Sequence, residues 1–469
     1  MHIRKIVSFV CILALSQAAW GQIKLPAIFS DNMVLQQQAQ VPFWGTSTPG
    51  HTVQITPSWD QHQYTVKADA SGNWRLRIQT PAAGGPYTIR LKDEQTLSLR
   101  NVLVGEVWVC SGQSNMERPM QGVTNQPVLN SNEILLHARD SALRLFHVER
   151  KVALDPQQDC AGSWAVSNAE NARTFSAVGY QFAKKMQDLL GVPVGIIEAA
   201  WGGTPIEGWM DPESWRAFDG KVAVPASSNP PKANPHLPSC LYNGMINPIA
   251  GYGIKGFLWY QGENNRRNPS WYRSMMAAMV KGWRQQWDQA ELPFYYVQIA
   301  PYDYGKSRDS VPYLREAQTQ AMSVIPHSGM VVSVDVGNKY SIHPADKTTI
   351  ANRLLYWALG DTYHWKGIAY HSPQYKGMLI KAGQVTLVFD HAPLGLTSFD
   401  QPIMGFELAG ADRKFYPAEA HIQSKSRVVL QSKDVPDPVA VRYLFKDWNP
   451  GNLFSTSGLP VTPFRTDHW

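Results

Sequence analysis

Four short polar segments of the sequence each follow an apolar run that is typical of a buried β-strand. The first contains Ser114, which comes soon after the apolar residues 102–110. A serine in a tight turn at a strand end can expose its hydroxyl and receive backbone N–H donors, as the nucleophile of acyl transfer requires. Another segment contains His343, and the following Pro344 suits the first position of a helix. Because a serine hydroxyl is unreactive near neutral pH without a base, this pair predicts acyl-transfer chemistry.

The two remaining segments carry groups that favour binding of a developing negative charge. Residues 201–204 hold adjacent glycines that let the backbone approach a bound oxygen closely, although a simple strand-to-loop turn is the alternative. Residues 260–265 place amide donors and a carboxylate beside a strand end, where a polar surface turn is the alternative. Open α/β sheets place ligand sites at the carboxyl ends of their strands, so we expect all four segments to converge.

Together these segments resemble the SGNH hydrolase superfamily and, within it, the sialate O-acetylesterase family with its acetylxylan-esterase relatives. The similarity lies in four blocks: Gly112-Gln113-Ser114-Asn115-Met116, Gly202-Gly203-Thr204, Trp259-Tyr260-Gln261-Gly262-Glu263 and Ile342-His343-Pro344. It continues in residues 405–410, 441–443 and 458–460, so it covers nearly the whole mature chain. The resemblance implies that Ser114 is the nucleophile, that His343 is the general base and that Gly202 donates its N–H to the oxyanion. It also implies a side-chain oxyanion donor from Asn264 or Gln261.

The sequence departs from the family pattern at the acid of the triad. SGNH enzymes usually place an aspartate just before the catalytic histidine, and here that position is Ser341. A charged imidazole still benefits from a carboxylate partner. The resemblance to acetylxylan esterases implies that Glu263 is this acid, with Asp335 and Asp346 as alternatives. A dyad of serine and histidine, oriented by a backbone carbonyl or by Ser341, is the remaining possibility.

The expected activity is that of a serine carbohydrate esterase that removes O-acetyl esters from glycans. Sialic acid is the favoured carrier of the acetyl group, and acetylated xylan is an alternative carrier. A non-catalytic glycan-binding protein is an alternative of another class. The mechanism requires no metal or organic cofactor. A lipase or peptidase is disfavoured because residues 112–116 depart from the Gly-x-Ser-x-Gly elbow.

The length of 469 residues predicts two or three domains. Residues 22–100 and 377–469 consist of short alternating runs, which predict β-sandwich-like modules. Residues 101–376 alternate strands with helix-period segments, which predicts an α/β domain with a three-layer, parallel-sheet, SGNH-like fold. We expect its strands at 102–110, 194–199, 254–260, 294–299 and 330–336. We expect its helices at 176–190, 271–287, 313–322 and 345–359, the first ending at Gly191.

Residues 1–21 have the layout of a cleavable signal peptide. Arg4 and Lys5 precede an apolar run at 6–15, and small residues follow, which predicts cleavage near Gln22 and a secreted or periplasmic protein. No later apolar stretch is long enough to span a membrane. The formal net charge of +6 has no long basic block behind it, so nucleic acid is not an expected partner. The oligomeric state is left open.

Three cysteines remain after the leader. Cys110 ends an apolar run and is expected to be buried in a strand. That leaves Cys160 and Cys240 as the expected disulfide. The cysteine and histidine spacings do not indicate a zinc site.

Overall fold

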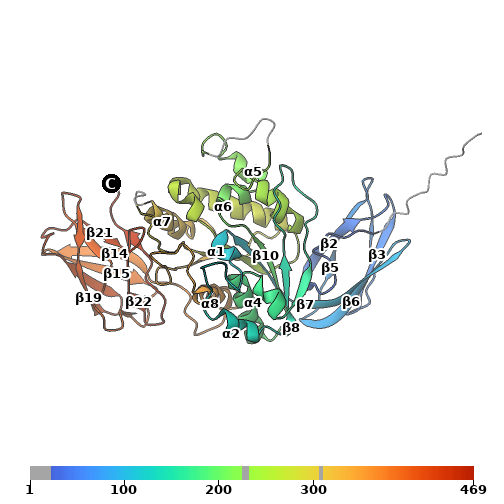
Figure 1. The fold of residues 1–469 in the computed structure, drawn as a ribbon, viewed down its shortest axis with the longest axis horizontal. Helices are drawn as coiled ribbons and strands as arrows, with labels where there is room; N and C mark the ends of the chain where they lie inside the picture. Colours follow the sequence, from blue (N-terminus) through green and yellow to red (C-terminus); the bar gives the residue numbers. More distant parts are fainter. Residues whose placement is uncertain (1–22, 224–231, 306–309) are drawn as a thin grey trace, which may run out of the picture.

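The computed structural model describes residues 23–223, 232–305 and 310–469. The predicted signal peptide therefore lies outside the described residues. Figure 1 shows a β-rich N-terminal region, a central α/β region and a β-rich C-terminal region, arranged in that order along the longest axis. This arrangement confirms the predicted fold class.

The central sheet carries the elements that position the polar segments. Its strand order is β13 (Ser328–Val331), β12 (Phe294–Val297), β11 (Gly256–Tyr260), β7 (Thr96–Gly112), β10 (Val194–Ala200), β8 (Asp140–His147) and β9 (Trp164–Ser167). Neighbouring strands are parallel except for β9, which pairs antiparallel with β8. All five predicted strands are present, although several ends differ. Strands β8 and β9 were not predicted from the sequence.

Helices cover both faces of this sheet (Figure 1). On one face α4 (Ala177–Leu190) packs against α8 (Lys347–Trp357), and on the other α6 (Pro269–Trp287) packs against α7 (Val311–Ala321). The apolar side chains under the two layers form two separate buried clusters. As predicted, α4 ends at Gly191, whose φ of 64° is a left-handed conformation that glycine adopts without strain.

Shorter helices connect these elements. The α-helices among them are α1 (Ser114–Glu117), α2 (Ser131–Leu136), α3 (Ala169–Arg173) and α5 (Pro212–Arg216). The other short helical turns are η1 (Ile206–Trp209), η2 (Tyr242–Ile246), η3 (Asn247–Ile249), η4 (Glu263–Arg267) and η5 (Ala358–Thr362). None of the helices in the described ranges is both long and apolar enough to cross a membrane.

The N-terminal region shares a strand with the central sheet. Its own strands are β1 (Val34–Gln36), β2 (Gln40–Thr46), β3 (Thr52–Pro57), β4 (Tyr64–Lys67), β5 (Asn73–Gln79) and β6 (Gly84–Lys92). The first half of β7 pairs with β6 and β1, and its second half pairs with β10 and β11. The predicted boundary between residues 100 and 101 therefore falls inside one continuous strand.

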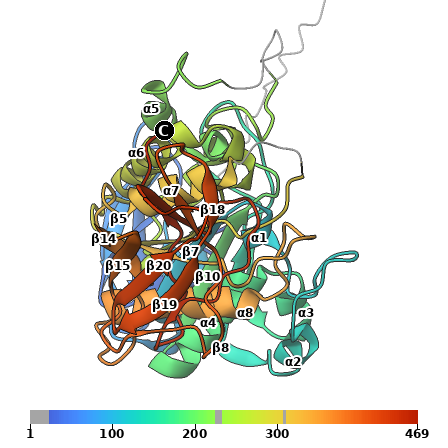
Figure 2. The same ribbon diagram turned by 90° about the vertical axis from the view of Figure 1, so that its left-hand side faces the viewer.

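The C-terminal region consists of antiparallel strands and stands in front in Figure 2. One sheet contains β14 (Gln374–Lys381), β15 (Gln384–Asp390), β20 (Arg427–Gln431) and β19 (Glu419–Ser424). Another contains β18 (Phe415–Pro417), β17 (Phe406–Ala409), β21 (Ala440–Tyr443) and β23 (Phe464–Arg465), and a two-stranded pair joins β16 (Leu396–Thr397) to β22 (Phe454–Ser455). Polar contacts tie this region to α7, where Glu316 accepts hydrogen bonds from Arg465 at 3.0 and 3.1 Å.

The expected disulfide is absent. Cys110, Cys160 and Cys240 are all free and buried, so the pairing of Cys160 with Cys240 was wrong. The prediction relied on the number of cysteines and on the expected burial of Cys110, and neither says whether the other two thiols lie within bonding distance. Burial raises the pKa of all three thiols, which keeps them protonated and unreactive.

Candidate active site

The ends of three neighbouring strands lie side by side at one edge of the central sheet. Gly112 of β7 is in register with Ala200 of β10 and with Tyr260 of β11, so the segments that follow these strands meet. Gly112 has a φ of 141°, and a Cβ atom there would lie 2.2 Å from the Tyr260 carbonyl oxygen. Only glycine fits this position, and the turn that it makes places Ser114 at the start of α1.

The structure brings Ser114 and His343 together. His343 lies in the segment between β13 and α8, and its Nε2 is 2.9 Å from the Ser114 Oγ. Burial, with the nearby Arg118 and Lys347 cations, lowers the pKa of His343 to about 4. The imidazole is therefore neutral near neutral pH and can accept the serine proton.

Glu263 lies in the same site, but the structure does not show it bonded to His343. The Glu263 Oε1 accepts a hydrogen bond of 2.6 Å from the side chain of Asn115, which also donates to the Ile342 carbonyl at 3.1 Å. The buried atoms of the site that lack a partner among the described residues include the His343 Nδ1 and the Glu263 Oε2. The Ser341 hydroxyl donates to the His343 carbonyl at 3.1 Å and accepts the His343 backbone N–H at 3.3 Å.

The alternative acids are engaged elsewhere. Asp335 forms a two-pronged pair with Arg353, with distances of 2.7 and 2.6 Å. Asp346 caps α8 by accepting hydrogen bonds from the Thr349 backbone N–H at 2.9 Å and its hydroxyl at 2.6 Å. Of the three acids, Glu263 alone has a buried carboxylate oxygen without a partner in the described part of the chain. The geometry therefore favours Glu263 over both aspartates.

The Gly202 N–H, expected to donate to the oxyanion, is beside Ser114 but already has a partner. A Cβ atom on Gly202 would lie 3.2 Å from the Ser114 Cβ, so the two residues are neighbours. The Gly202 N–H donates instead to the Glu117 Oε2 at 2.8 Å. The Ser114 N–H makes no hydrogen bond within the described ranges, and it is therefore free to donate to an oxyanion.

The two expected side-chain donors are also occupied. The Asn264 side chain donates to the Gly203 carbonyl. The buried Gln261 side chain donates to Thr204 at 3.1 Å and to Asn265 at 2.7 Å, and accepts from Tyr272 at 2.8 Å. Asn264 is exposed and can turn toward a substrate, whereas Gln261 braces the loop that carries it.

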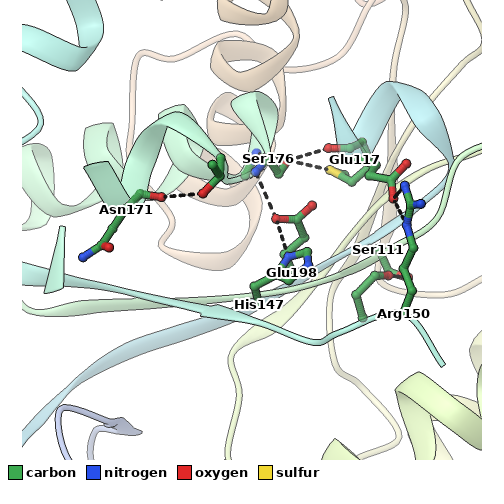
Figure 3. Close-up of polar contacts among 11 residues, drawn as sticks. Ser111, Glu117, His147, Arg150, Asn171, Ser176 and Glu198 are labelled. Carbon is green, nitrogen blue, oxygen red and sulfur yellow. Dashed lines mark hydrogen bonds and ion pairs between the residues drawn. The ribbon is translucent and has the colours of Figure 1, made fainter. Parts of the chain in front are cut away.

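Ser114 opens into a cavity of about 620 Å³. Its other lining residues are Glu117, Arg118, Pro119, Val123, His147, Glu149, Arg150, Thr174 and Glu198. Figure 3 shows two polar groups at this cavity, Glu117 with Arg150 and His147 with Glu198. None of these charged residues was predicted from the sequence. The one available signal was Glu198, an acid inside an otherwise apolar strand run.

The pair of His147 and Glu198 is held in a fixed orientation. The Glu198 Oε2 is 3.3 Å from the His147 Nδ1 and accepts the Ser176 backbone N–H at 3.0 Å. Burial raises the pKa of Glu198, and the hydrogen bond to Glu198 raises the pKa of His147. The ring is half-exposed and lines the cavity. Within the described ranges, no three side chains of His, Cys, Asp or Glu are grouped in a way that could hold a metal ion.

Comparison with known proteins identifies the family. Residues 104–355 match the family model described as carbohydrate esterase, sialic acid-specific acetylesterase. The chain belongs to this family. It is 29% identical to rat sialate O-acetylesterase over 97% of its length and 96% of the relative, and 28% identical to the human protein over 97% and 94%. A carbohydrate acetylesterase from Xanthomonas citri has a similar structure, with a TM-score of 0.87, 36% identity and coverage of 96% and 100%. This member of the family is therefore a carboxylic ester hydrolase.

Proposed function

We propose that this esterase removes O-acetyl groups from glycans, with sialic acid as the favoured carrier, and that Ser114 is its nucleophile. The contact of 2.9 Å between the Ser114 Oγ and the His343 Nε2 carries the proposal. His343 takes the hydroxyl proton while Oγ attacks the acetyl carbonyl. The tetrahedral intermediate collapses, and the sugar alcohol leaves with the proton from His343. Water, activated by the same imidazole, then releases acetate.

Groups of the site can stabilise both charges that develop in this reaction, the positive charge on His343 and the negative charge on the oxyanion. As His343 becomes charged, its Nδ1–H needs an acceptor, and Glu263 is proposed for this role because the His343 Nδ1 and the Glu263 Oε2 are both buried without a partner. The oxyanion accepts a hydrogen bond from the free Ser114 N–H. The oxyanion also accepts a hydrogen bond from the Gly202 N–H once the Glu117 carboxylate turns away from Gly202 toward Arg150. Glu117 is already bonded to Arg150.

Arg118 supports an acidic sugar as the substrate. This buried arginine lines the Ser114 cavity, and its Nη2 donates to Gln126 at 2.7 Å. Its Nη1 makes no hydrogen bond within the described part of the chain, so it remains available to a ligand. A guanidinium group binds a carboxylate strongly. Sialic acid carries a carboxylate, whereas a neutral xylose unit of xylan carries none. Acetylated xylan therefore stays the second candidate substrate.

The proposal is tested with purified protein and three substrates: O-acetylated sialic acid, acetylxylan and 4-nitrophenyl acetate, with released acetate or nitrophenol as the readout. We expect hydrolysis of all simple acetyl esters and the highest kcat/KM on the sialic acid ester. A protein inactive on every ester would be a glycan-binding relative without catalysis. A higher kcat/KM on acetylxylan would make the neutral polysaccharide the substrate.

The role of Arg118 has a direct control. Arg118→Met should lower the ratio of kcat/KM on O-acetyl sialic acid to kcat/KM on 4-nitrophenyl acetate by about tenfold, the value of one lost charge-assisted hydrogen bond. Arg173→Met is the matched control, because Arg173 also donates to a glutamine, Gln121, at 3.1 Å but is exposed outside the cavity. Equal ratios in both variants would remove the argument for an acidic sugar.

Export is the second part of the proposal. Residues 1–21 have the order of charged, apolar and small residues that signal peptidases recognise. We infer that the mature protein begins near Gln22 and acts outside the cytoplasm. N-terminal sequencing of protein recovered from the medium or periplasm tests this. An intact Met1 in the recovered protein would contradict it.

A further inference from the structure

Lys347 is a buried cation in a position that the fold alone disfavours. It is the first residue of α8, and its side chain is only 1% exposed. The positive end of a helix dipole repels a cation at this position. Burial also disfavours a charged amine, and a buried charge persists only where partners compensate for it. Its partners therefore indicate what the side chain does.

The ammonium group is linked to the Glu263 carboxylate through one fully buried side chain. The Lys347 Nζ donates to the Asn115 Oδ1 at 2.6 Å, and the Asn115 Nδ2 donates to the Glu263 Oε1, also at 2.6 Å. This chain fixes which way the Asn115 amide points, because its oxygen must face the lysine and its nitrogen the carboxylate. Lys347 thereby places a donor against one oxygen of Glu263 and leaves the other oxygen unpartnered.

Charged groups face Lys347 from several elements. Arg118, which follows α1, repels it, while Glu263 at the start of η4 and Asp346 at the cap of α8 attract it. The Tyr260 ring of β11 lies 5.8 Å from its Nζ. Burial and Arg118 together lower the pKa of Lys347 to about 7. Lys347 in turn opposes the burial that raises the pKa of Glu263, and it adds to the causes that lower the pKa of His343.

We propose that Lys347 is a positioning residue of the esterase, which acts through Asn115 to hold the Glu263 carboxylate ionised and oriented for His343. The inference rests on the proposed function, because it gives Lys347 a role in the same reaction. Lys347 touches no substrate. Its cation keeps Glu263 charged and His343 uncharged before the reaction, which is the combination that a general base and its supporting acid require.

Removal of the Lys347 cation raises the pKa of both Glu263 and His343. Without Lys347, the Asn115 oxygen loses its donor, and the amide is held only by the contacts of its nitrogen with Glu263 and the Ile342 carbonyl. Glu263 loses a stabilising charge. Protonation of Glu263 then becomes easier. The pKa of His343 also rises, because one neighbouring cation is gone. Both changes reduce the fraction of enzyme with a neutral imidazole and an ionised carboxylate at acidic pH.

The test is the pH profile of kcat and KM for Lys347→Met with 4-nitrophenyl acetate. We expect kcat to fall about tenfold or more near pH 6, KM to change little, and the acidic limb of kcat/KM to move to higher pH. The matched control is Lys185→Met. Lys185 of α4 also donates to an asparagine, Asn352, at 2.5 Å but lies outside the site, so its loss should leave the profile unchanged. Thermal unfolding of both variants separates lost stability from lost rate.

A double-mutant cycle with Glu263→Gln separates positioning from a general structural role. If Lys347 acts through Glu263, then Lys347→Met has little further effect on kcat once the carboxylate is gone, and only the shift that it causes directly in the pKa of His343 remains. Equal effects in both backgrounds would overturn the inference, as would a Lys347→Met profile identical to that of the wild type. Lys347→Gln removes the charge but keeps a polar side chain. This variant is used if Lys347→Met does not fold. A wild-type protein without esterase activity would instead refute the proposed function itself.

Discussion

Ser114 and Ser111 stand at the same strand end, but only one of them has its hydroxyl beside an imidazole. Ser114→Ala should lower kcat by several orders of magnitude without lowering Tm, because the triad loses its nucleophile and keeps only binding and oxyanion contacts. Ser111→Ala is the control. Its hydroxyl donates to the buried Ala199 carbonyl at 2.6 Å, so its loss should cost about 1 kcal/mol of stability and little activity. A Ser114→Ala enzyme that retained about a tenth of wild-type turnover would not have lost its nucleophile.

Glu263 differs from Asp335 in what its carboxylate does for the fold. Glu263→Gln keeps the shape and the acceptor for Asn115, so we expect a large fall in kcat with a nearly unchanged Tm. Asp335→Asn breaks a pair with Arg353 and should lower Tm more than kcat. Turnover and thermal unfolding of both variants check this. If both remain active, the site works as a dyad of Ser114 and His343.

The pH dependence of the reaction follows from His343. Because burial and two cations lower the pKa of His343 to about 4, the imidazole stays neutral well below the usual histidine range. Activity requires the neutral form, so the acidic limb of kcat/KM that belongs to His343 should fall near pH 4 rather than near 6.5, and Glu263→Gln isolates this limb from titration of the buried carboxylate. Initial rates on a neutral acetyl ester from pH 3.5 to 8 measure it. An acidic limb at the ordinary histidine value would mean that the cations do not act on this imidazole.

At the scale of elements, α8 holds the His343 segment in place through its cap. Asp346→Ala removes both hydrogen bonds to Thr349 and should destabilise the protein by about 1 kcal/mol. Asp346→Asn keeps an oxygen that can cap the helix, so its stability should stay close to that of the wild type. Chemical denaturation of the two variants provides the comparison. Equal losses would show that the charge of Asp346, rather than its cap, stabilises α8.

The sequence predicted the central strands and helices because their signals are local. Apolar runs, Gly191 and the strand-end polar segments each report on their immediate neighbours, and the common edge of a parallel sheet then brings Ser114 and His343 together. Strand β8 was missed because it begins with polar residues and carries the buried Arg144, which breaks the apolar run.

The sequence did not reveal the chain of contacts around Glu263. The partners Asn115 and Lys347 are 232 residues apart, so no sequence pattern joins them. The same holds for the Gly202 N–H, whose occupation by Glu117 depends on a side-chain rotamer. Hydrogen bonds between distant side chains are set by packing, and packing is absent from a linear pattern.

At the scale of the whole molecule, the N-terminal region and the central domain share core contacts as well as β7. The Trp164 Nε1 donates to the Ile28 carbonyl at 2.8 Å, and the Tyr252 hydroxyl donates to the Val34 carbonyl at 2.7 Å. A chain of residues 101–376 alone would expose these groups and the pairing edge of β7. We therefore expect that fragment to be insoluble or to unfold without a sharp transition. A soluble fragment with cooperative unfolding and Ser114-dependent activity would contradict this.

The uninterrupted course of β7 has a mechanical consequence. Its backbone runs without a break from the sheet of the N-terminal region to Gly112, two residues before the nucleophile. When the N-terminal region is pulled, the load travels along covalent bonds into the turn that orients Ser114. The hydrogen bonds of β10 and β11 on either side share that load in shear, the direction in which parallel strands resist most strongly. The nucleophile thus follows a strand that is hydrogen-bonded to a neighbour on each side.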